Sequence, residues 1–264
     1  MKSTLLKAVF AALIMLAGAQ AAQAEELRFG VAAEPYPPFA YKDSAGVWKG
    51  FEIDLMNAVC KEMKADCKLT EVAWDGIIPA LNEKKIDVIW SSMTITAARK
   101  QVIDFTIAYY DSATAIIGAK SDTTKVDLKH PETVAGKIFG VQTATIHADV
   151  IQKYFGKTAE VKFYDVLDNA LVDLAAGRVD YVQEGLLSLN PFLKSERGKD
   201  FEVKTLIENE PLLGEGVGGG LRKGDPIKAK IDAAIKAVTA SGEYAKIENS
   251  YPELAGNLVR PKVD

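Results

Sequence analysis

The sequence contains few of the residues from which metal and redox centres are built. It has two cysteines and two histidines in 264 residues, and neither His130 nor His147 has a cysteine or carboxylate at the spacing of a metal-binding motif. No Gly-x-Ser-x-Gly motif marks a nucleophilic serine. We therefore predict no metal site, no cofactor and no catalytic residues.

Positive charge is not in excess either. The chain has 32 Lys and Arg against 36 Asp and Glu, a net charge of −4, whereas a nucleic-acid-binding domain usually carries a basic patch. No segment is repeated or biased, and 48% hydrophobic with 26% charged residues is typical of a soluble α/β protein. We exclude nucleic acid as a partner and expect one large or two smaller domains.

The longest apolar run, AVFAALIMLAGA, lies near the N-terminus, with Lys2 before it, Lys7 at its start, and Ala22-Gln23-Ala24 after it. This pattern is typical of a secretory signal peptide cleaved after Ala24. The alternative, a transmembrane anchor, needs about 20 apolar residues. No cysteine near the cleavage site could accept a lipid, so we expect a soluble periplasmic chain from Glu25, with 30 basic and 36 acidic residues and a net charge of −6.

The two cysteines are Cys60 and Cys67. In an oxidising compartment, an even pair favours a disulfide over a metal or redox site. Seven residues of unbroken helix would hold them roughly 10 Å apart, beyond the reach of a disulfide. The helix that carries Cys60 is therefore expected to end near Ala65, and Cys67 to start the next strand. Two unpaired buried thiols are the alternative.

Extended apolar segments alternate with helical ones along the chain. The first set is LRFGVAA, GFEIDLMNAVCKEM, KLTEVA, WDGIIPALNEK, IDVIWSS and TAARKQV. The second set is KIFGVQ, TIHADVIQKYF, EVKFYD, DNALVDLAAG and VDYVQE, and VGGGLRK then leads into a helix from Pro226 to about Ala240. Such alternation indicates βαβ units on parallel sheets, here an α/β fold with two lobes.

Two segments are expected to connect the lobes. AYYDSATAIIGAK has no linker composition, so we expect a strand that passes directly from one lobe to the other, and the glycine-rich GEGVGGG could carry the chain back. This predicts a signal peptide over 1–24, lobe 1 over 25–111, lobe 2 over 112–213 and a return to lobe 1 over 214–264.

The segment SSMTITAAR directly follows the buried strand IDVIW. Ser91 and Ser92 end the strand, Thr94 and Thr96 can cap the next helix, and Arg99 lies in its first turn. Small ligands bind at the carboxyl ends of strands in open α/β sheets, and arginine binds a carboxylate through two parallel hydrogen bonds. The segment therefore predicts a carboxylate site. A capped helix with a solvated arginine is the alternative.

Several blocks of the sequence together resemble one family over nearly the whole mature chain. The blocks are EPYPPFAY, GFEIDLMNAVC, WDGIIPAL, SSMTIT with Arg99, VIDFTIAYY and GRVDYVQE. They resemble the polar amino-acid-binding proteins of ABC transporters, solute-binding family 3, and in particular the periplasmic histidine and lysine/arginine/ornithine receptors, in which two cysteines at this spacing form a disulfide. The resemblance implies a two-lobed periplasmic-binding-protein-like (type II) fold with two hinge crossings. It also implies a non-enzymatic receptor that closes on an α-amino acid and delivers it to a membrane permease.

The resemblance assigns the ligand's α-carboxylate to Arg99. Ser91, Ser92 and Thr94 match the family's hydroxyl positions, and Thr145 matches a helix-capping threonine that grips the same carboxylate from lobe 2. The preceding segment departs from the family, because Thr143 and Ala144 stand where Gly-Thr is more frequent.

Other residues are assigned to the ligand's ammonium and side chain. Glu184 stands where the family has an aspartate that binds the α-ammonium, with a surface acid as the alternative. Tyr36 and Trp74 match the rings that cover the ligand side chain, with core residues as the alternative. Glu34 follows the position where basic amino-acid receptors often have an acid. His147 is expected to be a surface or capping residue, with solute contact as the alternative.

Glu34 beside two aromatic rings favours lysine, arginine or ornithine as the ligand, and glutamine or another polar residue stays open. The enzymatic alternative is a periplasmic cyclohexadienyl dehydratase of the same fold, with Glu184 or Glu34 as general acid. A receptor or channel sensor domain would need a transmembrane segment after residue 240, and the sequence has none. We expect a monomer.

Overall fold

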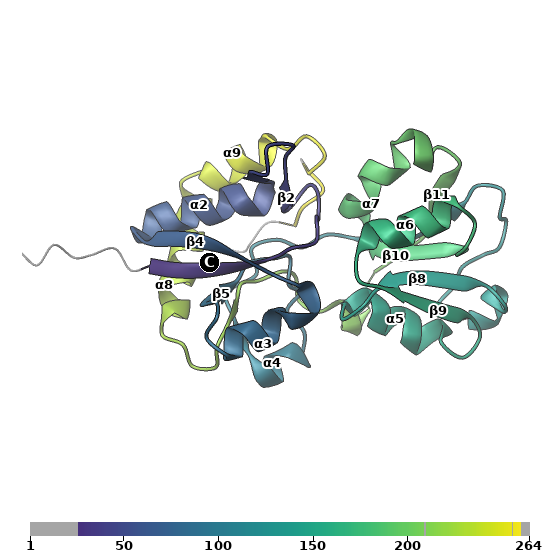
Figure 1. The fold of residues 1–264 in the computed structure, drawn as a ribbon, viewed down its shortest axis with the longest axis horizontal. Coiled ribbons are helices and arrows are strands. Elements are labelled where there is room, and N and C mark those ends of the chain that lie inside the picture. The colour runs from purple at the N-terminus through teal and green to yellow at the C-terminus, as the bar shows by residue number, and fades with distance from the viewer. Residues whose placement is uncertain (1–25, 209, 255, 260–264) are drawn as a thin grey trace, which may run out of the picture.

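The structure is a computed structural model that describes residues 26–208, 210–254 and 256–259. The predicted signal peptide lies outside these residues. The chain forms two α/β lobes joined by two crossings (Figure 1). No helix in the described ranges is long and apolar enough to cross a membrane.

Lobe 1 is a five-stranded sheet with helices on both faces. Its strands are β1 (Glu26–Ala32), β4 (Asp66–Val72), β5 (Val88–Ile89), β6 (Asp104–Phe105) and β12 (Gly220–Leu221), in the order β4-β1-β5-β12-β6. Three helices share one apolar core against β1: α2 (Phe51–Met63), α8 (Ile227–Ala240) and α9 (Glu243–Asn249). The other core contains α3 (Ile77–Asn82), beside the short α4 (Arg99–Val102) and the 3-10 turn η1 (Trp74–Gly76). A hairpin of β2 (Tyr41–Lys42) and β3 (Trp48–Lys49) lies outside the sheet.

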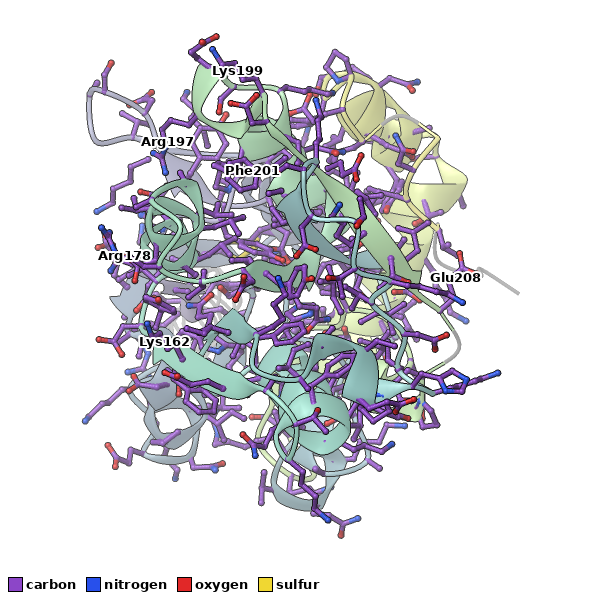
Figure 2. The ribbon with its side chains drawn as sticks, turned by 90° about the vertical axis from the view of Figure 1, so that its right-hand side faces the viewer. Lys162, Arg178, Arg197, Lys199, Phe201 and Glu208 are labelled. Atoms are coloured by element: carbon purple, nitrogen blue, oxygen red, sulfur yellow. A yellow bond between two sulfur atoms is a disulfide. The ribbon has the colours of Figure 1, made fainter. Side chains whose placement is uncertain are left out.

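Lobe 2 repeats this layering with a second five-stranded sheet. Its strands are β7 (Thr114–Ala119), β8 (Ile138–Gln142), β9 (Glu160–Tyr164), β10 (Tyr181–Gly185) and β11 (Phe201–Ile207), in the order β11-β7-β10-β8-β9. Helix α5 (Ile146–Phe155) covers one face, and α6 (Leu167–Ala175) and α7 (Leu186–Leu193) cover the other. The 3-10 turns η2 (Pro131–Val134), η3 (Glu196–Gly198) and η4 (Pro211–Leu213) lie in its loops. The far end of lobe 2 exposes Arg178, Arg197 and Lys199 (Figure 2).

The two sheets are mixed, so the expectation of parallel sheets is wrong for some strands. Strand β12 runs antiparallel to β5 and β6, and β7 runs antiparallel to β10 and β11. Both β7 and β12 enter their sheet directly from the other lobe, without a helical crossover on the sheet face. A parallel strand requires such a crossover, whereas an antiparallel one does not.

The two crossings between the lobes lie side by side. Tyr109 N–H donates to the Val217 carbonyl at 2.8 Å, and Val217 N–H donates to the Tyr110 carbonyl at 2.8 Å. Asp111 also exchanges backbone hydrogen bonds with Val259. The predicted outward and return segments are therefore paired where they pass between the lobes.

The predicted disulfide is confirmed. Helix α2 ends at Met63, and Lys64 adopts a left-handed conformation with φ 54°. The chain then reverses so that Cys67 is the second residue of β4. The Cα atoms of Cys60 and Cys67 are 6.2 Å apart, and their sulfur atoms are bonded. The early helix end is what brings the two cysteines within reach.

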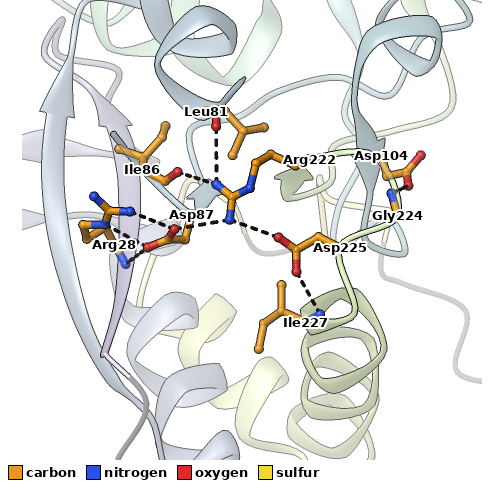
Figure 3. A network of polar contacts seen from close by, with 9 residues as sticks. All are labelled: Arg28, Leu81, Ile86, Asp87, Asp104, Arg222, Gly224, Asp225 and Ile227. Carbon is orange, nitrogen blue, oxygen red and sulfur yellow. Dashed lines mark hydrogen bonds and ion pairs between the residues drawn. The ribbon is translucent and has the colours of Figure 1, made fainter. Parts of the chain in front are cut away.

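Charged contacts fix the return segment to lobe 1 (Figure 3). Arg28 donates two hydrogen bonds of 2.9 Å from Nε and Nη2 to the carboxylate of Asp87. Arg222, just after β12, reaches the same carboxylate at 3.3 Å and the Ile86 carbonyl at 2.8 Å. Burial alone would raise the pKa of Asp87, but the hydrogen bonds from Arg28 lower it. This ion-pair network joins β1, β5 and β12 at the end of the sheet.

Candidate functional site

A cavity that is partly open to solvent lies between the lobes. All nine residues predicted to contact the ligand line it: Glu34, Tyr36, Trp74, Ser91, Ser92, Thr94, Arg99, Thr145 and Glu184. Five further residues complete the lining, namely Ala32, Pro35, Gln142, Ile146 and His147. The cavity is formed where strands β1, β5, β8 and β10 end, so residues distant in sequence meet at the facing edges of the two sheets.

Two serines close the end of β5. Ser91 Oγ accepts a hydrogen bond of 2.9 Å from the N–H of Ala32, which ties the ends of β5 and β1 together. Ser92 is left-handed with φ 51°. Its N–H and its hydroxyl both donate to the carboxylate of Glu52, at 2.8 and 2.7 Å. The Ser92 hydroxyl proton is therefore already engaged, so this hydroxyl can offer a ligand only its lone pairs.

Glu52, which fixes Ser92, was not predicted from the sequence. It is fully buried in the first turn of α2 and also accepts a hydrogen bond of 2.5 Å from the Tyr109 hydroxyl. Burial raises the pKa of Glu52, while the hydrogen bonds from Tyr109 and Ser92 oppose that shift. The sequence could have indicated a buried acid here, because Glu52 lies inside the apolar segment GFEIDL and helix periodicity places its position on the buried face.

Arg99 is half-buried and has no carboxylate within ion-pair distance among the described residues. Its Nη1 donates to the Thr94 carbonyl at 3.0 Å, and its Nη2 donates to the Ala144 carbonyl of lobe 2 at 3.3 Å. Burial lowers the pKa of Arg99 to about 10, so it stays charged at neutral pH. A half-buried guanidinium whose side-chain hydrogen bonds go only to carbonyls is a strong site for an incoming carboxylate.

Of the two threonines predicted to cap the helix of Arg99, Thr96 does so and Thr94 does not. Helix α4 begins only at Arg99, and Thr96 Oγ1 accepts from the Arg99 N–H at 3.2 Å. Thr94 does not cap this helix, because its backbone is bridged to Val217 of the return crossing. It contributes a cavity-lining side chain and the carbonyl that holds Arg99.

Glu34 and Trp74 form one wall of the cavity. The Glu34 carboxylate accepts from the backbone N–H of Trp74 at 3.1 Å. The Trp74 indole donates to the Ala144 carbonyl at 3.2 Å, and the Arg99 guanidinium lies 5.6 Å from the ring centroid. Trp74 is therefore a half-buried wall residue that touches both lobes. The alternative of a core residue does not apply to it.

The N-terminus of α5 points into the cavity from lobe 2. Thr145 is its N-cap, and the hydroxyl accepts from Ala148 N–H at 3.1 Å and donates to the Gln142 carbonyl at 2.7 Å. The first N–H groups of a helix have no partner within it, so this end attracts an anion. Ala144, in the departing segment, is left-handed with φ 58° and turns its carbonyl toward Trp74 and Arg99.

Glu184 is buried, with 1% of its surface exposed, so the alternative of a surface acid is excluded. Its Oε1 accepts from Tyr36 Oη at 3.0 Å and from Gly185 N–H at 2.8 Å, and lies 2.5 Å from His147 Nε2. Burial and then the charge of Glu184 raise the pKa of Tyr36 well above its usual value, so Tyr36 remains a donor. Oε2 accepts no hydrogen bond within the described part of the chain.

His147 was expected at the surface or as a cap, and that expectation is wrong. Its exposed fraction is 7%, and it lines the cavity beside Glu184. The reason is the direction of α5, whose first turn faces lobe 1 and so carries His147 inward. The sequence did contain an indication of this inward position. His147 lies two residues after Thr145, beyond the carboxyl end of a predicted strand, where residues that line a ligand site gather.

Comparison with known proteins gives one consistent family. The family model of the bacterial extracellular solute-binding proteins, family 3, matches residues 27–253. The chain is 41% identical over 231 residues to the L-arginine-binding protein of Pseudomonas aeruginosa. The aligned region covers 85% of this chain and 87% of that protein. It is 35% identical over 254 residues to the lysine/arginine/ornithine-binding periplasmic protein of Escherichia coli. That aligned region covers 95% of this chain and 96% of the E. coli protein.

The fold is also similar to solved structures. An ancestral arginine-binding protein bound to arginine superposes with a TM-score of 0.78 at 32% identity, covering 86% of this chain and 97% of that chain. The predicted two-lobed architecture is therefore confirmed. The matched residues include every residue that lines the cavity.

Proposed function

The chain belongs to the bacterial extracellular solute-binding proteins, family 3, and from this premise we propose that it is a periplasmic receptor for a polar, cationic L-α-amino acid. It delivers that ligand to the permease of an ABC transporter. Its relatives are named for binding arginine, or lysine, arginine and ornithine, and they are named as binding proteins, which supports a receptor without enzymatic activity.

The observation that carries this proposal is the separation of charge across the cavity. Arg99 presents a guanidinium from lobe 1, and Glu184 presents a free carboxylate oxygen from lobe 2. A zwitterion that reaches both is bound better by the closed arrangement than by an open one, and so it favours closure. A ligand without the carboxylate or the ammonium leaves a desolvated charge unpaired, which costs several kcal/mol.

The fixed donors and acceptors suggest how the ligand lies. The α-carboxylate faces Arg99 and the first N–H groups of α5, with Thr145 holding that helix end in place. The α-ammonium faces Glu184 Oε2 and the lone pairs of the Ser92 hydroxyl, whose proton is engaged by Glu52.

The ligand side chain lies along the wall formed by Tyr36, Trp74 and Glu34. Aromatic faces attract cations, and Glu34 adds a negative charge at the same wall. This favours lysine, arginine or ornithine.

The proposal extends to the whole chain. The signal peptide is cleaved after Ala24, and the mature monomer begins at Glu25. Residues 25–111 with 214–264 move as one lobe and residues 112–213 as the other. The paired crossings at Tyr109, Tyr110 and Val217 form the hinge, because backbone pairing there holds the lobes together while they open.

Thermal unfolding of the mature protein, freed of bound ligand by unfolding and refolding, tests this proposal. L-Arginine, L-lysine or L-ornithine should raise the melting temperature by several degrees, whereas the D-enantiomers should not. If no amino acid stabilises the protein while prephenate or arogenate is consumed, the chain is an enzyme of the dehydratase type and the receptor proposal is wrong.

A further inference from the structure

His147 and Glu184 form a buried pair that the family resemblance did not assign. Their exposed fractions are 7% and 1%, and His147 Nε2 lies 2.5 Å from Glu184 Oε1. Water and salt screen a pair that is buried to this extent much less than an exposed pair. The charge of the histidine ring therefore acts directly on the carboxylate proposed to bind the α-ammonium.

The contacts of Glu184 fix one of the two ring nitrogens. An ionised carboxylate only accepts hydrogen bonds, so Nε2 of His147 must carry a proton to approach Oε1 this closely. This proton is present in both the neutral and the charged ring. The charge of His147 therefore depends on its other nitrogen, Nδ1.

Gln183 can accommodate either state of Nδ1. Its Nε2 lies 2.9 Å from His147 Nδ1, and its Oε1 is buried without a partner in the described part of the chain. With the amide N–H directed at Nδ1, the ring is neutral. A half-turn of the amide brings Oε1 to Nδ1, where it accepts a proton from a charged ring. The same side chain can therefore solvate the neutral or the cationic histidine.

The charged and titratable groups around His147 come from several elements. Glu184 on β10 and Tyr36 after β1 lie on one side, Asp149 belongs to the same helix α5, and Arg99 and Glu34 face it across the cavity from lobe 1. His147 also lines a second cavity, whose ionisable residues besides Tyr36 are Tyr110, Asp111, Glu208 and Glu210. A neutral His147 leaves the full negative charge of Glu184 to an ammonium. A cationic His147 neutralises Glu184 and repels the same ammonium.

We propose that His147 is a positioning residue for Glu184 and that binding of an α-amino acid drives a proton from a cationic His147 into the solvent. This rests on the proposed function, because it requires an α-ammonium at Glu184. Histidine side chains ordinarily change charge between about pH 5 and 8. Linkage then requires the affinity to fall with the pH, by at most about tenfold per pH unit for one proton.

Isothermal titration with L-arginine between about pH 8 and 5.5 tests this coupling over the range in which histidine titrates. Each pH is measured in two buffers of different ionisation enthalpy, which counts the protons released. The wild type should lose at least about tenfold in affinity across this range and release a proton that the buffer takes up.

Two variants separate His147 from other titrating groups. In His147→Gln the side-chain amide can still donate to Glu184 but cannot take up a proton, so its affinity should vary by less than about threefold over the same range. The matched control is His130→Gln, since the chain has only these two histidines and His130 lies in an exposed loop. This control should keep the pH dependence of the wild type.

The outcomes are distinct. A wild type that binds L-arginine with a flat pH profile and no proton release would refute the coupling alone. So would a His147→Gln variant that keeps the pH dependence. Failure of every amino acid to bind at pH 8 would refute the proposed function and the coupling with it. If His147→Gln does not fold, nuclear magnetic resonance of the histidine rings decides. The His130→Gln control identifies the His147 signal, which should show loss of a proton when L-arginine binds and would refute the coupling if it did not change.

Discussion

The two halves of the cavity are built differently. In lobe 1, Ser91, Ser92 and Arg99 come from one short segment, and their contacts are to backbone groups or to the buried Glu52. In lobe 2, Glu184, His147 and Gln183 contact one another from β10 and the start of α5. The lobe 1 half is fixed by contacts to backbone groups and to one buried acid, whereas the lobe 2 half depends on side chains that contact one another. We therefore propose that lobe 1 supplies the carboxylate site and that lobe 2 supplies an ammonium site that responds to pH.

Removal of the lobe 1 cation should have the largest effect on binding. Arg99→Ala is expected to weaken L-arginine binding by at least about 100-fold, because the ligand carboxylate would be buried without its charged partner. The ligand-free protein should keep its stability, since no acid pairs with Arg99 within the described residues. Calorimetric titration and thermal unfolding without ligand measure the two effects.

Arg197→Ala is the matched control. Arg197 is exposed at the far end of lobe 2 (Figure 2), away from the cavity, so its loss should leave the affinity unchanged. Binding that survives in Arg99→Ala would show that the carboxylate is held elsewhere.

Removal of the lobe 2 charge should have the next largest effect. Glu184→Gln keeps the shape but loses the negative charge, and we expect L-arginine to bind about 10- to 100-fold more weakly, as for the loss of one hydrogen bond to a charged group. Equilibrium dialysis with labelled ligand measures this loss. An unchanged affinity would mean that the ammonium does not contact Glu184.

A change at Glu52 should have a smaller effect and tests whether the Ser92 hydroxyl accepts a hydrogen bond from the ligand. In Glu52→Gln the amide can donate to the Ser92 hydroxyl, which reverses that hydrogen bond and frees the hydroxyl proton to face the ammonium. We expect about tenfold weaker binding of L-arginine, the loss of roughly one hydrogen bond. Equal affinity in a folded variant would show that Ser92 does not accept from the ligand.

The smallest effect on affinity is expected at the ion-pair network of lobe 1. Asp87→Asn should lower the free energy of unfolding by about 1–3 kcal/mol, because Arg28 and Arg222 lose a charged acceptor. The affinity for L-arginine should change less than twofold, since Asp87 does not line the cavity.

The pH dependence of stability gives a second measure of this variant. The pKa of Asp87 is lowered in the folded protein, so its contribution to stability is present above the ordinary aspartate range and is lost as the pH falls. Between about pH 5 and 3 the variant should therefore lose less stability than the wild type. Denaturant unfolding at each pH measures the difference. An equal loss in both proteins would contradict the lowered pKa.

Much of the fold and of lobe 1's site could be predicted from the sequence. The alternation of elements gives the two lobes, and SSMTITAAR places hydroxyls and Arg99 at a strand end, because these depend on local periodicity and capping. The direction of β7 and β12 could not be read in this way, since it depends on how the crossings enter the sheets. The inward position of His147 and the partner of Ser92 depend on contacts between residues far apart in sequence.

The central claim is that a zwitterion joins Arg99 of lobe 1 to Glu184 of lobe 2. Calorimetric titration of the wild type with L-arginine, with agmatine and with 5-guanidinovaleric acid tests it most directly, because the two analogues lack only the α-carboxylate and only the α-ammonium. L-Arginine should bind, and each analogue should bind at least about 100-fold more weakly, as expected when one buried charge loses its partner. Equal binding of either analogue would contradict the claim.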